Sequence, residues 1–408
     1  MKTSLRCSGC GHPVPPLEPR PFRCPNADAD GGDHVLVRRL EAVEAAPFFD
    51  PEPNPFVRYR RLTHAWHTAM AIGMSDAEFV SAVLALDARV VAIDGRGFRE
   101  TPLHLGEITV KDETANVAGS HKARHLMGLM IWLRVAERID PSLAGQRLAI
   151  ASCGNAALGA AVVARAAERA LDVFVPSDAP PTIVARLREL GARVTACARE
   201  PGLAGDPAYR RFRAAVSAGA LPFTCQGSEN GLVIEGGQTL GWEIASQLAA
   251  AATAIDRCFI QVGGGALASA CIAGLDEAHA AGVIPRLPRI HAVQTRAVAP
   301  LARAWERVAA HGLQDAIAHR ARAMWPWEEP RPSVATGILD DETYDWVAVV
   351  RGMLKTGGFP LVVGEEELIE ARRRAGERVS ATGAAGLAGL LQLERVGESQ
   401  LVLFTGAA

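Results

Sequence analysis

Short apolar strands alternate with helices through much of this chain, and that alternation constrains the fold more than any other feature. "QRLAIAS" predicts a strand that runs directly into the alanine-rich helix "CGNAALGAAVVARAAERA". "DVFVPSD" predicts a second strand, "APPTIVARLRELGA" a helix and "RVTAC" a third strand. Further strands are predicted at "RCFIQVGG", "RIHAVQT" and "SQLVLFTG", with helices between them. Strands joined by helices build a mainly parallel sheet, so we expect an α/β fold.

Size and charge narrow the class of ligand. The chain has 408 residues, of which 49% are hydrophobic and 22% charged, so it can bury a full core and form about two domains. Lysine and arginine number 43 against 45 for aspartate and glutamate, which leaves no strong field to attract nucleic acid or an anionic membrane. The sequence contains no apolar stretch of signal-peptide or membrane-spanning length. We expect a cytoplasmic protein that binds a small molecule.

The first 60 residues differ in character from the rest. They are rich in proline and polar residues, and "FFDPEPNPFVRYRR" is typical of an extended linker that wraps the body. Residues 61–408 are expected to form the catalytic body. Early in that body, "SDAE" at residues 75–78 predicts a capping box that opens a helix.

Three cysteines of the N-terminal extension have metal-ligand spacing. Cys7 and Cys10 form a CxxC pair and Cys24 follows, which is typical of a zinc knuckle that lacks its second CxxC. A tetrahedral site needs a fourth donor, which His34 or Asp28 could supply. The alternative is a vestigial knuckle held by packing without metal. The remaining cysteines are scattered through predicted helices and strands, as reduced buried thiols would be: Cys153, Cys197, Cys225, Cys258 and Cys271.

A glycine-rich loop follows one of the predicted strands. Its backbone N–H groups could converge on a phosphate with no Cβ in the way, or the loop could be a plain turn. It lacks a Walker lysine and does not match the GxGxxG dinucleotide fingerprint. The loop consists of Gly263, Gly264, Gly265, Ala266 and Leu267.

A second loop, Ser152-Cys153-Gly154-Asn155, lies between a predicted strand and a helix. Unpaired amides at a helix start could hold a substrate carboxylate, and Asn155 offers a side-chain amide. The alternative is a helix N-cap by Ser152 or Asn155. Cys153 could be a reactive thiol or simply a small residue, and the second interpretation is favoured.

The stretch "NVAGSHKARH" places Lys122 directly after small residues, which let a backbone approach a ligand closely. The order of Lys122, the S-x-G-N loop at residue 152, the glycine triplet at 263 and Thr405-Gly406 after the last strand resembles that of the fold type II pyridoxal-phosphate (PLP) enzymes. This group contains threonine synthase, serine/threonine dehydratase, cysteine synthase and the tryptophan synthase β chain. The resemblance covers about residues 95–408.

The resemblance implies two open, twisted, mainly parallel sheets flanked by helices, with a smaller subdomain at about residues 115–225 inserted in a larger one. It implies pyridoxal 5'-phosphate as cofactor, bound by Lys122 as a Schiff base. Asn155 would bind its 3-hydroxyl oxygen, the glycine loop its phosphate, and Thr405 would face its pyridine nitrogen. His121 in "GSHK" looks like the histidine of tryptophan synthase β chains, which lies near the phosphate, or it could be a structural histidine packed beside the loop.

The resemblance points to the threonine synthase branch through the cysteine-bearing extension, "TPLHL" and "EGGQTLGWEI". Ala123 departs from the Lys-Asp-Arg run that is usual there. The resemblance implies elimination or replacement on a small β- or γ-substituted amino acid. The Lys122 amine would take the Cα proton. The expected assembly is a homodimer. The alternatives are a serine/threonine dehydratase, a β-replacement synthase, or a non-catalytic PLP-binding or zinc-knuckle interaction protein.

Acidic groups late in the chain are interpreted as structural. "GEEE" before residue 368 is typical of a helix start, and Asp340-Asp341 of a solvated turn. "SVATGILDD", which contains them, falls where related enzymes have a loop beside the cofactor ring. "ATGAAGLAGLLQLE", from Ala381, predicts a core helix packed against the sheet.

Overall fold

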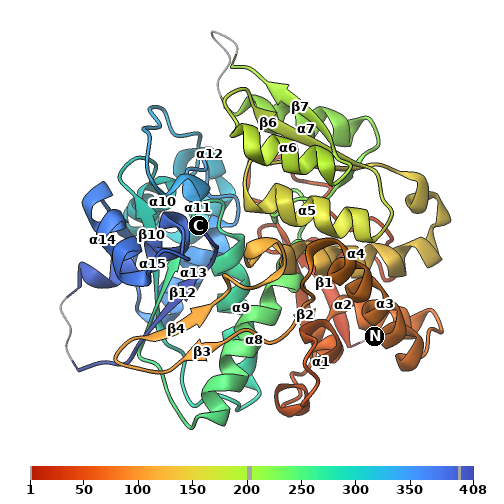
Figure 1. The fold of residues 1–408 in the computed structure, drawn as a ribbon, viewed down its shortest axis with the longest axis horizontal. Coiled ribbons are helices and arrows are strands. Elements are labelled where there is room, and N and C mark those ends of the chain that lie inside the picture. Colours follow the sequence, from red (N-terminus) through yellow and green to blue (C-terminus); the bar gives the residue numbers. More distant parts are fainter. Residues whose placement is uncertain (1, 200–204, 394–396) are drawn as a thin grey trace.

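A computed structural model of the chain describes residues 2–199, 205–393 and 397–408. They form two sheets flanked by helices and a separate N-terminal hairpin (Figure 1). The predicted α/β architecture is therefore confirmed. The α-helices are α1 (Pro55–Arg58), α2 (His64–Ala71), α3 (Asp76–Asp94), α4 (Lys122–Ile139), α5 (Asn155–Ala166), α6 (Pro181–Glu189), α7 (Pro207–Ser217), α8 (Val233–Ala250), α9 (Ala266–Ala280), α10 (Pro300–His311), α11 (Leu313–Ala318), α12 (Arg320–Ala323), α13 (Trp346–Thr356), α14 (Glu365–Ala375) and α15 (Ala381–Leu391).

The larger sheet has six strands, all parallel except for the edge strand β3. From one edge to the other they are β11 (Leu361–Val363), β10 (Arg289–Thr295), β9 (Arg257–Gln261), β12 (Gln400–Phe404), β4 (Thr109–Asp112) and β3 (Leu103–His104). Successive side chains of β12 point to opposite faces of the sheet, as they do in any β-strand. Val402 packs with α14 and α15, whereas Leu401 and Leu403 pack with α8, α9 and α13. The predicted helix from Ala381 is thus confirmed as a core helix on this sheet.

The smaller sheet has four parallel strands in the order β7 (Arg193–Cys197), β6 (Leu171–Pro176), β5 (Leu148–Ala151) and β8 (Leu221–Pro222). These strands lie between residues 148 and 222, within the range expected for the smaller subdomain. Leu148 and Ile150 of β5 face a cluster built by α3, α4 and α5, and Ala149 faces Phe212 of α7 on the other side. The strand therefore has two covered faces, as its continuous apolar sequence requires.

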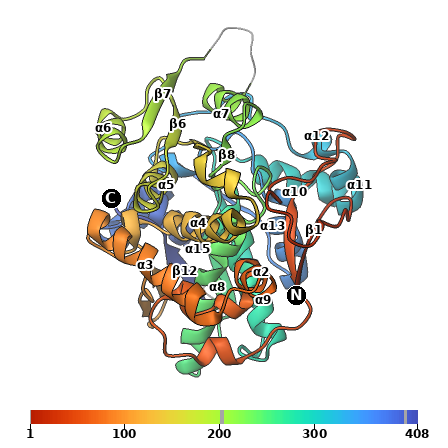
Figure 2. The same cartoon turned by 90° about the vertical axis from the view of Figure 1, so that its right-hand side faces the viewer.

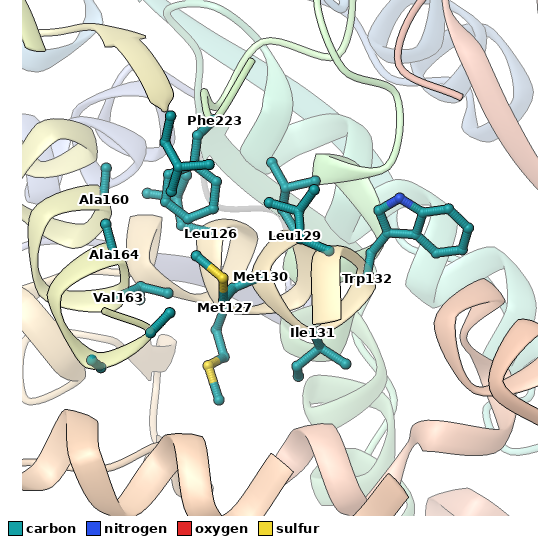
Figure 3. Close-up of a cluster of buried hydrophobic side chains, with 14 of the residues drawn as sticks. Leu126, Met127, Leu129, Met130, Ile131, Trp132, Ala160, Val163, Ala164 and Phe223 are labelled. Atoms are coloured by element: carbon teal, nitrogen blue, oxygen red, sulfur yellow. The ribbon is translucent and has the colours of Figure 1, made fainter. Parts of the chain in front are cut away.

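Helix α4 carries Lys122 at its first position and is buried along most of its length. Figure 3 shows Met127 and Met130 of α4 beside Val163 and Ala164 of α5, with Phe223 above them. The backbones of α4 and α5 come close together at Gly159 of α5, because this residue has no side chain. A Cβ added to Gly159 would lie 3.2 Å from Ala123 Cα of α4. Tight packing on α5 fixes where the start of α4 lies.

The N-terminal extension is folded, which corrects the predicted extended linker. Strands β1 (Thr3–Cys7) and β2 (Leu36–Leu40) form an antiparallel hairpin, and residues 46–62 form α1 with two 3₁₀ helices, η1 (Ala46–Phe49) and η2 (Arg60–Leu62). Phe48, Phe56 and Tyr59 are buried. Burial of these aromatic side chains against the body, together with a cap by Asn54 on α1, holds this proline-rich stretch in short turns.

Other local predictions are confirmed. Ser75 and Glu78 form the predicted capping box of α3. The remaining 3₁₀ helices are η3 (Val117–Gly119), η4 (Pro141–Gly145) and η5 (Thr336–Ile338). Within the described part of the chain, no helix combines the length and apolarity that a bilayer crossing needs.

Candidate functional site

The start of α4 lies against the carboxyl end of β12. Ser120 pairs with Gly406 as an isolated β-bridge, and the backbone N–H of His121 donates to Thr405 O at 3.2 Å. His121 Nδ1 lies 3.0 Å from the same carbonyl oxygen and must be its donor, because a carbonyl only accepts. These contacts place Lys122 beside the carboxyl end of β12.

His121 is buried beside Lys122 in a neutral state. Burial and the positive charge of Lys122 hold the pKa of His121 well below its usual range. With Nδ1 protonated, Nε2 carries a lone pair, and it has no hydrogen-bond partner among the described residues. Such a nitrogen is available to a ligand, and the Nε2 atoms of the buried His125 and His291 share this property.

Thr405 and Asn155 meet at the same end of β12. Thr405 Oγ1 accepts a hydrogen bond from Gln261 Nε2 at 2.7 Å. A Cβ added to Gly406 would lie 2.8 Å from Asn155 Nδ2, so the Asn155 amide lies directly against the Gly406 backbone. The sequence predicted that Asn155 and Thr405 share a site with Lys122, and the structure brings the three together.

The glycine loop lies between β9 and α9, as predicted. Gly265 has φ of +97°, which only glycine adopts without strain, and α9 begins at the next residue. A Cβ on Gly263 would lie 2.9 Å from Ile338 Cα and 2.3 Å from Asp340 Oδ2. The backbone N–H of Asp345 also donates to Gly264 O at 3.0 Å. The loop is therefore covered closely by the 338–345 segment and has no room for side chains.

The prediction that Asp340 lies in a solvated turn is wrong. Its carboxyl is half-buried at the glycine loop, where burial raises the pKa of Asp340 to about 6 although Lys122 and a hydrogen bond from the Gly264 backbone favour the charged form. The Gly264 N–H thus already serves a carboxylate oxygen. A backbone N–H at a helix start that donates to a carboxylate can also donate to another anion, such as a phosphate.

The Ser152–Asn155 loop opens α5 without a side-chain cap. The N-cap residue is Gly154, and Ser152 Oγ accepts only from the Gly154 backbone, at 3.3 Å. Neither Ser152 nor Asn155 caps the helix, so the N-cap alternative is wrong and the first N–H groups of α5 lack side-chain acceptors. Cys153 is half-buried, and burial raises the pKa of its thiol, which favours the interpretation as a small residue over a thiolate nucleophile.

Lysine is scarce in this chain, and the four lysines differ in their partners. Lys2 pairs with Glu44 at 3.0 Å, Lys355 pairs with Asp276, and the fully buried Lys111 pairs with Glu243 at 2.6 Å. Lys122 is half-buried, and no described carboxylate lies within ion-pair distance of it. Lys122 is therefore the lysine that forms no ion pair with the described residues.

A buried charge network anchors the first turn of α4, and the sequence analysis missed it. Arg124 pairs with Glu113 at 2.8 Å and with Glu243 at 3.0 Å, and Lys111 joins through Glu243. The Thr101 hydroxyl donates to Glu113, and the Thr101 backbone N–H donates to Glu243 at 2.7 Å. Glu113 follows β4 and Glu243 lies on α8, so the network ties two elements to the turn that presents Lys122. The available signal was the run of charged residues in "TVKDE", a stretch for which the sequence analysis predicted no element.

The predicted zinc ligands also come together. One ligand atom from each of Cys7, Cys10, Cys24 and His34 lies within 4.8 Å of the others. Asp28, the other predicted fourth donor, pairs instead with Arg23 at 2.9 Å.

Comparison with known proteins shows the family of the chain. The profile of the family "Pyridoxal-phosphate dependent enzyme" matches residues 96–406. The chain belongs to this family. It is 25% identical over 299 residues to threonine synthase of Methanocaldococcus jannaschii, covering 72% of this chain and 67% of the relative. It is 31% identical over 182 residues to L-serine dehydratase of Saccharomyces cerevisiae, covering 43% of this chain and about half, 53%, of that relative.

A solved structure shares the fold. The processed form of threonine deaminase isoform 2 from Solanum lycopersicum superposes with a TM-score of 0.57 at 18% identity, covering 82% of this chain and 91% of that one. The family uses pyridoxal 5'-phosphate. The residues around Lys122 fit that group. Lys122 forms no ion pair with the described residues, the Gly264 N–H of the glycine loop donates to a carboxylate, and His121 Nε2 has no hydrogen-bond partner among the described residues.

Proposed function

We propose that this protein catalyses elimination or replacement on a small β- or γ-substituted L-amino acid, in the manner of threonine synthase. The observation that carries the proposal is the half-buried Lys122, which forms no ion pair with the described residues and whose charge acts on Asp340, the carboxyl that lies against the glycine loop. Membership in the PLP enzyme family and the identity to a threonine synthase support it.

In this proposal, five sets of groups divide the binding of the cofactor. Lys122 holds it covalently, and the N–H groups of the glycine loop hold its phosphate, with His121 Nε2 beside them. Asn155 Nδ2 binds its 3-hydroxyl oxygen, and Thr405 Oγ1 faces its ring nitrogen. When bound, the cofactor supplies the electron sink for a carbanion at the substrate Cα. The loop residues involved are Gly263, Gly264, Gly265, Ala266 and Leu267.

The chain's own residues then bind the substrate and move its proton. The loop of Ser152, Cys153, Gly154 and Asn155 receives the substrate carboxylate at the positive end of α5, which no side chain caps. The Lys122 Nζ would be released when the substrate amine takes its place, and the free amine would then take the proton from the substrate Cα. Thr405 already accepts from Gln261, so its hydroxyl hydrogen remains available to donate, and a neutral hydroxyl does not hold a ring nitrogen protonated. This favours departure of a group at Cβ or Cγ over transamination.

A serine/threonine dehydratase is the second candidate, and charge favours it over a phosphorylated substrate. Asp340 is influenced by Lys122 and by the acidic groups Asp206 and Asp341, whereas Arg199 lies 3.9 Å from Asp341 and is largely exposed. Among the described residues the neighbourhood of Lys122 is thus acidic, which opposes binding of a substrate phosphate. The identity to a serine dehydratase supports this candidate.

The test is a spectral titration combined with product assays. The cofactor-loaded protein would be titrated with serine, threonine and O-phosphohomoserine while the visible band is recorded, and ammonia and inorganic phosphate would be measured. Ammonia release from serine or threonine selects the dehydratase, and phosphate release from O-phosphohomoserine selects the threonine synthase reaction. If the protein forms no visible band with excess pyridoxal phosphate, the proposed function is wrong.

We also propose that the chain is a cytoplasmic homodimer, as its resemblance to this fold group implies. Light scattering on the purified protein would give the mass in solution. A mass near 43 kDa, that of one chain, would contradict the dimer, and a mass near twice that value would support it.

A further inference from the structure

Four thiol and imidazole groups of the N-terminal extension converge on one point. Cys7 Sγ lies 3.4 Å from His34 Nδ1, and Cys10 Sγ lies 3.7 Å from Cys24 Sγ. All four atoms lie within 4.8 Å of one another. The two donors of each close pair come from distant positions in the extension, so the convergence is a property of its fold.

These separations match those of a tetrahedral zinc site. With Zn–S bonds of about 2.3 Å and Zn–N bonds of about 2.0–2.1 Å, neighbouring sulfurs lie about 3.8 Å apart, and sulfur and nitrogen about 3.5 Å. A disulfide would require two sulfurs at about 2.05 Å. The Cys10–Cys24 separation therefore fits a shared metal and is too long for a bond.

The surroundings of the donors supply a second, independent sign of a metal. His34 Nε2 lies 2.7 Å from Asp30 Oδ1, which fixes the ring so that Nδ1 carries its lone pair toward the sulfurs. The Asn26 amide also donates to Cys10 Sγ at 3.5 Å, as expected around a thiolate ligand. A packed knuckle without metal would need neither orientation.

We propose that Cys7, Cys10, Cys24 and His34 bind one structural Zn²⁺, and that this metal holds the extension against two segments that flank Lys122. The two segments are 225–232 and 338–346. The metal site stands on its own geometry, whereas its link to Lys122 rests on the proposed function.

The first segment is held by residues adjacent to Cys24. Phe22 O accepts from the Gly231 backbone N–H at 3.0 Å, and Arg23 Nε donates to Ser228 O at 3.3 Å. A Cβ on Gly231 would lie 2.0 Å from Leu36 O of β2, so the segment fits closely against the hairpin. The metal-bound turn therefore sets the position of residues 228–231.

The second segment is reached through the first. The Gly227 backbone N–H donates to Asp345 Oδ2 at 3.2 Å, and the Asp345 N–H donates to Gly264 O of the glycine loop. Cys225 Sγ lies 4.0 Å from Lys122 O at the start of α4. One chain of contacts thus runs from the cysteine cluster to both sides of the candidate site.

The same extension is also fixed on its outer side. The Asp33 N–H donates to Ile317 O at 2.8 Å, the Arg320 N–H donates to Gly31 O at 3.1 Å, and Arg351 donates to Ser8 O. Figure 2 shows the N-terminal loops beside α11 and α12. The cysteine cluster therefore lies between the outer helices and the 225–232 segment, where loss of its metal would loosen both contacts.

The test measures zinc in the full-length protein purified under reducing conditions. We expect about one zinc per chain by elemental analysis, and less than a tenth of that in Cys10→Ser and His34→Gln. The matched controls are Cys197→Ser, a buried thiol on β7, and His12→Gln, a nearby histidine outside the cluster. Both controls are expected to retain zinc.

Hydrogen exchange tests the link to the site. Zinc would be removed from the wild-type protein with a chelator and restored by adding zinc alone, which avoids variants that fail to fold. We expect exchange in residues 225–232 and 338–346 to rise at least about tenfold on removal and to recover on addition, while β10 stays unchanged.

Two results would overturn parts of the proposal. Reduced protein that neither contains nor takes up zinc would disprove the metal site. Zinc that binds but leaves exchange in both segments unchanged would disprove the link. Neither result depends on pyridoxal phosphate, so failure here is distinguishable from failure of the proposed function.

Discussion

Two polar regions lie on either side of the first turn of α4, and they treat their charges in opposite ways. On one side, Arg124 and Lys111 are fully buried, and their charges are matched by Glu113 and Glu243. On the other side, Lys122 has no described ion-pair partner. The groups near it keep unpartnered atoms, namely His121 Nε2 and Asp345 Oδ1.

The difference separates scaffold from site. Buried charges that satisfy one another leave nothing for a ligand and fix the backbone around them. Buried polar atoms without partners carry a cost that a bound group can remove. The same helical turn therefore serves both purposes: its Arg124 side is anchored, and its Lys122 side is left available.

The largest effect should come from the available side. Lys122→Ala should lower activity at least about a thousandfold, because it removes both the covalent attachment and the base. Its unfolding free energy should change little. The matched control Lys355→Ala, which loses an exposed ion pair, should keep full activity. Steady-state kinetics and urea unfolding check this, and a fully active Lys122→Ala protein would contradict the comparison.

The anchored side should show the opposite pattern, with a loss of stability. Arg124→Ala should lower the unfolding free energy by about 3–5 kcal/mol, because Glu113 would remain buried without its ion-pair partner and Glu243 would keep only Lys111. Arg138→Ala, at an exposed position on the same helix, should change the unfolding free energy by no more than about 0.5 kcal/mol. Denaturant unfolding of the cofactor-free protein measures both. Equal losses in the two variants would show that the network is not an anchor.

Asp345 sharpens the comparison through pH. Burial raises the pKa of Asp345 from an ordinary 3.8 to about 7. Folding therefore favours its protonated form, and this contribution to stability is complete below about pH 4 and is lost as pH rises through 7. Asp345→Asn should remove a fall in stability of about 3 kcal/mol between pH 5 and 8, because about two pH units of that interval lie below the folded pKa and each contributes roughly 1.4 kcal/mol. Parallel pH profiles of the two cofactor-free proteins would refute a buried, uncompensated carboxyl.

The smallest expected effect concerns the glycine loop. Gly263→Ala places a methyl group 2.9 Å from the Ile338 backbone and should weaken pyridoxal phosphate binding about tenfold, or about 1.4 kcal/mol. Gly145→Ala, where an added methyl meets nothing within 4 Å, should leave the affinity unchanged. Fluorescence titration of the cofactor-free proteins gives both constants. An unaltered affinity in Gly263→Ala would mean that the loop does not bind the phosphate.

Local patterns predicted much of this molecule. The apolar runs predicted β5, β6, β7, β9, β10 and β12 but missed the short strands β3, β4, β8 and β11. "SDAE" predicted the start of α3, because capping is a property of a short stretch. The order of four motifs predicted which loops meet at Lys122. The scarcity of lysine was also visible in the sequence, although it was not used.

The features that the sequence analysis missed depend on contacts between distant segments. Glu243 follows Lys111 by 132 positions, so nothing near Lys111 reveals that its charge is paired and buried. The local sequence of Asp340 is typical of a turn, and only the packing of residues 338–345 on the glycine loop shows that Asp340 lies at the site. The aromatic residues of the proline-rich stretch are likewise held by the body. Pairing and burial at long range could not be predicted from local composition.

The most direct test of the central claim is to locate the cofactor on the chain. The cofactor-loaded protein would be reduced with borohydride, digested with trypsin and analysed by peptide mass spectrometry. With only four lysines in the chain, each site of attachment can be distinguished. The account predicts a phosphopyridoxyl group on Lys122 alone, and attachment at Lys2, Lys111 or Lys355 instead would contradict it.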